Sequence, residues 1–254
     1  MEYLSDLIYL IPLLFIAGVL DGIAGGGGII ALPAYLLTGM PIHSAYACNK
    51  LQSGCGTLCS GIKYIKEKLC DIRVALIALP FTVLSSMLAT KAVLNMDGEK
   101  IKLIIAVCIP LAVILMFSKR KIGSKSETRH KISPKVILLS ILSGAILGTY
   151  DALFGPGGGS IAIIIFSLLL SYELRVGCGN GKIIIVVSNF TALINYIIGG
   201  HIIWHVAIPC TLSNMLGSYI GAVMAVKKGE KIVFPAMLAI IATLVVQTVF
   251  KFFF

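Results

Sequence analysis

The chain has 254 residues, of which 58% are hydrophobic and 13% charged, and it carries a formal net charge of +10. A soluble domain is about 45–50% apolar and about 25% charged, so this composition excludes an ordinary soluble protein and indicates an integral membrane protein. The seven cysteines lie mostly in apolar runs, which does not fit a secreted disulfide framework. Glu2 and Asp6 precede the first apolar run, where a cleavable signal would be positively charged, so no signal peptide is predicted.

The positive charge is concentrated in a few polar stretches. Fifteen of the 21 Lys and Arg residues fall at 63–73, 119–135, Arg175 and 227–231. Basic clusters beside membrane spans are typical of cytoplasmic loops. The charge therefore predicts the orientation of a multi-pass protein of the cytoplasmic membrane, with the lipid bilayer rather than nucleic acid as its partner.

In chain order, an apolar stretch at 7–38 is broken in its middle by glycines and is expected to form two short helices in a hairpin. Six further segments each have about 20 residues, the length that crosses a hydrocarbon core of about 30 Å. They are 43–63, 73–95 and 100–118 before a basic linker, and 175–199, 203–226 and 231–252 after it. A second broken stretch, at 135–172, follows the linker and repeats the pattern of the first.

The two halves also resemble each other residue by residue. "DGIAGGGG" begins at Asp21 and "DALFGPGGG" begins at Asp151, with Pro156 as one inserted residue. The register after this insertion pairs Asn49 with Asn180, and "GEKI" at 98–101 with "GEKI" at 229–232. The predicted organisation is an N-terminal transmembrane repeat at 1–118, a basic cytoplasmic linker at 119–134 and a C-terminal transmembrane repeat at 135–254.

The distribution of basic loops favours one topology. A hairpin plus three spans per half inverts the second half, which places the basic loops at 63–73 and 227–231 inside and their neutral partners outside. A single span for each broken stretch would instead make the repeats parallel and put basic and neutral partners on the same side. The predicted fold is an all-α integral membrane protein of two inverted-topology repeats, an arrangement typical of secondary transporters.

The glycine breaks are candidate binding turns. A backbone interrupted at membrane depth is tolerated where it is buried in protein or lines a polar cavity. Short helices are expected to begin at Ile29 and Ser160, and the free N–H groups of such helix ends attract anions. The alternative is that the glycines only let helices pack closely. Neither run contains a phosphate-binding or dinucleotide-binding motif.

The segments "GIAGGGGIIALPAYLLTGMP" and "GTYDALFGPGGGS" resemble the two signature segments of the TauE/SafE sulfite exporter family, also called the toluene sulfonate uptake permeases. The resemblance covers nearly the whole chain. It implies transport of sulfite, sulfonates, thiosulfate or other small sulfur-containing or carboxylate anions. The chain departs from the family pattern at Ala152, where glycine is common, and at Cys48, where small or hydroxyl residues are common.

Polar residues within the spans complete the candidate substrate site. Ionisable groups in the membrane usually face a cavity or a partner, so Lys50 and Lys182 are expected to counter an anion, unless they snorkel to an interface. Asn49 and Asn180 offer donors and acceptors, unless they only join helices. The full set of candidate substrate-binding residues is Gly25, Gly26, Gly27, Gly28, Asn49, Lys50, Gly157, Gly158, Gly159, Ser160, Asn180 and Lys182.

Asp21 and Asp151 flank the two glycine breaks and have two candidate roles. A buried carboxylate could couple transport to a proton, and an aspartate is also a favoured cap for the N-terminus of a short helix. The sequence favours the capping role.

Other reactive groups give weaker signals. Cys48, Cys55 and Cys59 share one helix face, which leaves a membrane thiol-handling or metal-handling protein as an alternative function, and Cys178 lies beside Asn180. Neither a metal site at His201 and His205 nor a cofactor is expected, and no catalytic constellation predicts an enzyme. The main prediction is a secondary transporter that binds a small sulfur-containing anion between the hairpins. An anion channel is the second alternative, and homo-oligomerisation is left open.

Overall fold

The computed structural model describes residue 3, residues 5–96 and residues 129–253, and its secondary structure in these ranges is helical. In the first half, the helices are α1 (Leu7–Ala24), α2 (Gly28–Leu37), α3 (Ile42–Lys66) and α4 (Ile72–Leu94). In the second half, they are α6 (Pro134–Leu153), α7 (Gly158–Leu170), α8 (Leu174–Ile198), α9 (Trp204–Lys228) and α10 (Glu230–Phe253). Helices occupy five of the six predicted segments to within a few residues, and the segment predicted at 100–118 lies outside the described residues.

The helices have the lengths and surfaces of a membrane bundle. Five of the described helices, α1, α4, α6, α8 and α9, are long and apolar enough to cross a bilayer. Large apolar side chains such as Ile8, Leu37 and Leu216 are exposed on the outside. Polar side chains, including Asp21, Lys50 and Gln52, are buried inside. Apolar side chains on the outside and polar side chains inside are the pattern expected for a multi-pass membrane protein surrounded by lipid.

Both apolar stretches are broken where the sequence predicts. Gly25 ends α1 with a φ of +73°, and Gly155 has the same φ after α6, a conformation that glycine adopts without strain. The expectation of two short arms is wrong for the first arm of each hairpin, because α1 has 18 residues and α6 has 20. The second arms, α2 and α7, are short, with 10 and 13 residues, and they begin at Gly28 and Gly158 rather than at Ile29 and Ser160.

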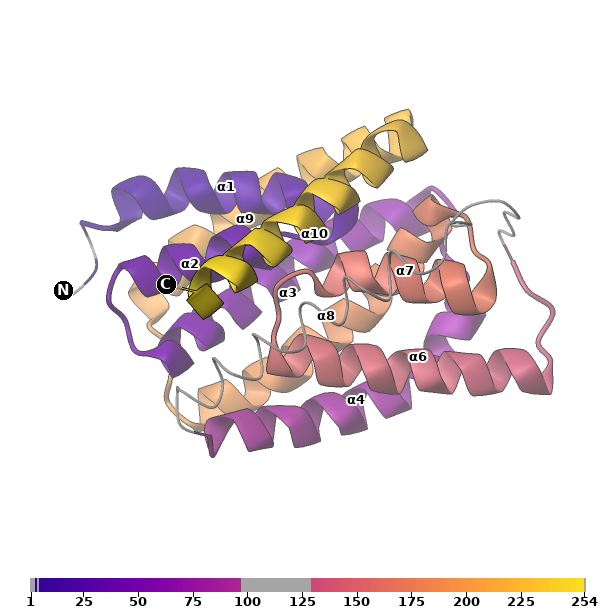
Figure 1. Cartoon of the computed structure of the whole chain (residues 1–254), viewed down its shortest axis with the longest axis horizontal. Helices are drawn as coiled ribbons and strands as arrows, with labels where there is room; N and C mark the ends of the chain where they lie inside the picture. Colours follow the sequence, from indigo (N-terminus) through magenta and orange to yellow (C-terminus); the bar gives the residue numbers. More distant parts are fainter. Residues whose placement is uncertain (1–2, 4, 97–128, 254) are drawn as a thin grey trace.

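The helices of the two halves interleave. α1 of the first half packs along α9 of the second, and α4 packs along α6, while α3 lies against both α8 and α9. Figure 1 shows α1 and α6 running in opposite directions, each followed by a short arm that turns back. The centre of the bundle is therefore lined by both halves, and residues distant in sequence meet there.

The linkers before corresponding helices have matching backbone geometry. Pro41 precedes α3 with φ −54° and ψ 142°, and Glu173 precedes α8 with φ −53° and ψ 145°. Asp71 before α4 and Ile203 before α9 agree equally well. These positions are 132 residues apart, because α7 is three residues longer than α2 and its linker is one residue shorter.

The 132-residue register corrects one sequence pairing. Asn49 is the eighth residue of α3, whereas Asn180 is the seventh residue of α8. Lys50 and Lys182, in contrast, both hold the ninth position of their helices. The two lysines, and not the two asparagines, therefore hold matching positions in their helices.

Candidate functional site

The two glycine turns meet at the centre of the bundle. The amide of Gly159 donates to the carbonyl of Gly25 at 3.1 Å, and the hydroxyl of Ser160 donates to the carbonyl of Ala24 at 2.8 Å. A Cβ on Gly25 would lie 2.3 Å from the Cα of Gly159, a separation that real atoms do not adopt. At this contact, the glycines are required for close packing of backbone on backbone.

The remaining glycines of the first turn are similarly enclosed. A Cβ on Gly27 would lie 2.6 Å from the carbonyl oxygen of Ala17, and one on Gly28 would lie 3.0 Å from the Cα of Pro156. A Cβ on Gly26 would meet the flexible end of Ile240. In this conformation, protein atoms lie against each of these glycines.

Buried ion pairs flank the turns. The ammonium of Lys50 on α3 donates to a carboxylate oxygen of Asp151 on α6 at 2.9 Å, and also to the carbonyl of Asp151. Their side chains are 0% and 3% exposed. The turn is immediately adjacent, because a Cβ on Gly155 would lie 3.7 Å from the Nζ of Lys50. The first-half lysine therefore neutralises the second-half aspartate.

The reciprocal pair joins Lys182 on α8 to Asp21 on α1. The ammonium of Lys182 donates to the carbonyl of Asp21 at 2.8 Å and lies 4.0 Å from its carboxylate. That carboxylate also accepts hydrogen bonds from the hydroxyls of Thr57 at 2.9 Å and Ser218 at 3.5 Å. We call Asp21, Lys50, Asp151 and Lys182 the charge-paired centre. Its two cations and two anions have a formal net charge of zero.

The geometry decides between the alternatives left by the sequence for these four residues. Snorkelling is wrong for both lysines, because they are fully buried and paired. Side-chain capping is wrong for both aspartates: they lie within α1 and α6, and α2 and α7 have no side-chain cap. Each carboxylate instead holds a buried lysine of the other half.

The two candidate asparagines have different surroundings. The side-chain oxygen of Asn49 accepts a hydrogen bond from the side-chain amide of Gln52 at 3.1 Å, and the side-chain nitrogen of Asn49 faces the turn at Gly155. The side-chain oxygen of Asn180 accepts a hydrogen bond at 2.7 Å from the backbone N–H of Asp71, just before α4 begins. The side-chain nitrogen of Asn180 has no partner among the described residues. Asn49 thus lies beside the charge-paired centre, and Asn180 anchors a linker.

The cysteines do not form a metal centre in the described structure. Cys48 is buried, whereas Cys55 and Cys59 on the same helix are partly exposed. No group of three His, Cys, Asp or Glu residues within the described ranges could hold a metal ion. Cys70, in the linker between α3 and α4, is buried, and burial raises the pKa of its thiol to about 12. This thiol therefore stays protonated and unreactive at neutral pH.

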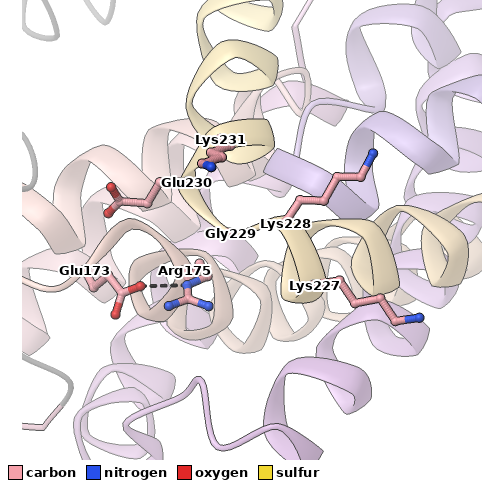
Figure 2. A pocket seen from close by; sticks show the side chains of 7 residues that line it. All are labelled: Glu173, Arg175, Lys227, Lys228, Gly229, Glu230 and Lys231. Carbon is pink, nitrogen blue, oxygen red and sulfur yellow. Dashed lines mark hydrogen bonds and ion pairs between the residues drawn. The ribbon is translucent and has the colours of Figure 1, made fainter.

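A second collection of charge lies at the surface, where α8 and α10 begin and α9 ends (Figure 2). Arg175 is paired with Glu173 at 2.6 Å, and Lys227 and Lys228 point away from that pair. The pocket also contains Glu230 and Lys231. Because Arg175 is paired and Lys227 and Lys228 point away from it, these cations do not converge on a common anion site.

Comparison with known proteins decides the family. The family model described as "Sulfite exporter TauE/SafE" matches residues 10–248, which include both hairpins and the charge-paired centre. The chain belongs to the TauE/SafE family. This assignment agrees with the all-helical bundle and with the resemblance of the two glycine segments.

Relatives within the TauE/SafE family are named as transporters. The chain is 30% identical to a probable membrane transporter protein of Haemophilus influenzae, covering 87% of this chain and 86% of the relative. It is 28% identical to the probable membrane transporter protein YfcA of Escherichia coli K12, covering 96% and 93%. A probable membrane transporter protein of Bacillus subtilis, YdhB, is 22% identical over 84% and 88%. No solved structure matches. The protein is a multi-pass membrane transporter.

Sequence reasoning missed the uncharged polar side chains that hydrogen-bond to Asp21 and Asn49. Thr57 and Ser218 hold the Asp21 carboxylate, and Gln52 holds Asn49. A single hydroxyl in an apolar helix has no periodic or motif signal. Thr57 and Gln52 lie on the helix that carries Lys50, which was the one available clue to them.

Proposed function

We propose that this TauE/SafE transporter is a secondary transporter of small sulfur-containing anions, of the sulfite, thiosulfate or organosulfonate class. The anion would bind between the two hairpins, at the charge-paired centre and the adjoining glycine turns. The observation that carries the proposal is the reciprocal pairing of Lys50 with Asp151 and of Lys182 with Asp21 beside those turns. Two buried lysines at the crossing of two broken helices supply the positive charge that an anion needs inside a membrane.

The neutrality of this centre points to a coupling mechanism. An anion that claims the ammonium of Lys50 or Lys182 releases a buried carboxylate, which is costly to leave unpaired. For a singly charged anion such as a sulfonate, one proton on that carboxylate restores a net charge of zero, whereas a doubly charged anion such as thiosulfate requires a proton on each aspartate. The anion and its protons would therefore move together. Asp21 and Asp151 are the proton acceptors in this scheme, and the glycine-turn amides become available to the anion as the hairpins separate.

The inverted repeat is part of the same proposal. Under a two-fold relation, the contact from Lys50 to Asp151 requires a matching contact from Lys182 to Asp21, and both are present. The opposite directions of α1 and α6 and the matched linker geometry before α3 and α8 also support it (Figure 1). Rocking of one repeat against the other around the centre would then open the site to each side in turn.

A binding screen tests the proposal. The purified protein in detergent is melted with sulfite, thiosulfate, sulfate, methanesulfonate or chloride at constant ionic strength. We expect at least one sulfur oxoanion to raise the melting temperature in a saturable way, and to do so more strongly at lower pH, because the proposed coupling takes up a proton with the anion. Equal effects of chloride and of every sulfur anion would contradict the substrate class, and a stabilisation independent of pH would contradict the coupling.

A further inference from the structure

An uncharged polar cluster lies one helical turn from the charge-paired centre. Tyr35 on α2, Tyr46 on α3 and Tyr196 on α8 belong to one cluster of buried residues, together with the thiols Cys48 and Cys210. The three tyrosines are 0%, 1% and 0% exposed. The hydroxyls of Tyr46 and Tyr196 have no hydrogen-bond partner among the described residues, whereas that of Tyr35 lies against the Cys210 thiol. Buried hydroxyls in native proteins are nearly always bonded, so two unbonded ones in one cluster need an explanation.

Residues of α2, α3 and α8 form the cluster. The phenols of Tyr46 and Tyr196 lie next to each other, and Tyr35 lies beside Cys210. The ring of His201 lies 6.2 Å from that of Tyr196 and 5.3 Å from that of His43, whose buried Nδ1 also has no partner within the described ranges. Within the described residues, no carboxylate is hydrogen-bonded to these phenols. The cluster therefore offers neutral donors and no competing negative charge.

The position of the cluster relates it to transport. Tyr46 and Lys50 are four residues apart on α3, so they share one face and are separated by about 6 Å along the helix axis. An anion that leaves Lys50 along this face would meet the tyrosine hydroxyls next. The loop at 199–203, which precedes α9, lies at the same end of the bundle as these tyrosines, because the His201 ring packs against the rings of His43 and Tyr196.

The symmetric position in the other half is different. Tyr64 of α3 and Tyr196 of α8 both hold position 23 of their helices. The hydroxyl of Tyr64 donates to the carbonyl of Ile23 at 3.4 Å and lies 3.3 Å from the thiol of Cys178. The buried hydroxyl of Tyr172 likewise donates to Asp71 at 2.7 Å. Buried tyrosines at that end are bonded within the protein, so the absence of partners is a property of the Tyr46 and Tyr196 end.

We propose that Tyr46 and Tyr196 supply the donors of a second, uncharged oxoanion subsite next to the charge-paired centre. The subsite rests on the proposed function, since it lies on the route of the same anion. An oxoanion accepts one hydrogen bond from each of these two phenols. Because no cation lies in the cluster, binding there is weaker than at the lysines, which allows the anion to pass on rather than remain.

Phenylalanine substitution tests the subsite with an internal control. The double variant Tyr46→Phe/Tyr196→Phe removes two unbonded hydroxyls, so its melting temperature without ligand should equal or exceed that of the wild type. Its affinity for the oxoanion that stabilises the wild type should fall at least tenfold. The control Tyr64→Phe removes a bonded hydroxyl from the symmetric position, so it should lower the ligand-free melting temperature and keep the wild-type affinity.

The outcomes separate this inference from the proposed function. If the wild type binds an oxoanion and Tyr46→Phe/Tyr196→Phe binds it equally well, the subsite is overturned and the proposed function stands. If the wild type binds no sulfur oxoanion, both are overturned. A double variant that loses ligand-free stability as Tyr64→Phe does would also contradict the subsite, because it would show that these hydroxyls are bonded within the protein.

Discussion

The ion pair between Lys50 and Asp151 makes a quantitative prediction. The two groups are 2.9 Å apart with side chains 0% and 3% exposed, so Lys50→Met leaves an unpaired carboxylate in the bundle. Removing one partner of a buried pair costs about 3–5 kcal/mol. At about 2–4 °C per kcal/mol for a chain of this size, the melting temperature should fall by about 6–20 °C. Asp151→Asn leaves an unpaired ammonium and should have a similar effect.

The double variant is the decisive comparison. Lys50→Met/Asp151→Asn removes both charges together, and replacement of a whole buried pair is often nearly neutral for stability. We expect the double variant to regain most of the lost melting temperature in detergent and still to bind no anion. Lys182→Met should lose less than Lys50→Met, because Thr57 and Ser218 continue to hold the Asp21 carboxylate. If the losses of the two single variants simply add in the double variant, the two groups are not coupled and the reasoning is refuted.

Two further predictions concern the turns and the topology. Gly159→Ala should destabilise the protein by about 1–3 kcal/mol, because its Cβ would lie 2.4 Å from the Cα of Gly25. The control Gly61→Ala should be neutral or stabilising, because its Cβ would lie at an ordinary 3.6 Å from its nearest neighbour. Equal melting curves for the two variants would contradict the close packing of the turns. In a background without native cysteines, Ile202→Cys and Lys228→Cys should react with an impermeant maleimide from opposite sides of the membrane, with Lys228→Cys on the cytoplasmic side. Reaction of both from one side would refute the inverted topology.

The sequence predicts the helices well, because a span must satisfy both a length and a hydropathy. It also predicts the breaks, since four consecutive glycines at residues 25–28 cannot form an ordinary helix interior without cost. The register between the halves is less predictable. The helix lengths that set it differ by three residues between α2 and α7, and no motif in the sequence marks that difference.

The candidate site also has a part that the sequence reveals and a part that it does not. Lys50, Lys182, Asp21 and Asp151 stand out in the sequence because charge is rare within apolar spans. Their partnership does not, because it joins residues 101 and 161 positions apart across two interleaved halves. The tyrosine hydroxyls are invisible to sequence reasoning for a different reason. A tyrosine in a membrane helix is common, and only its packing reveals whether the hydroxyl has a partner.

The most direct test of the account is transport by the purified protein in liposomes. Uptake of ³⁵S-labelled sulfite and thiosulfate is measured with and without an imposed proton gradient, beside Lys50→Met/Asp151→Asn liposomes of equal protein content. The account predicts saturable uptake of at least one anion by the wild type, faster with a proton gradient in the same direction, and none by the variant. Wild-type uptake no faster than that of the variant for every sulfur anion would contradict the claim that the charge-paired centre carries these anions across the membrane.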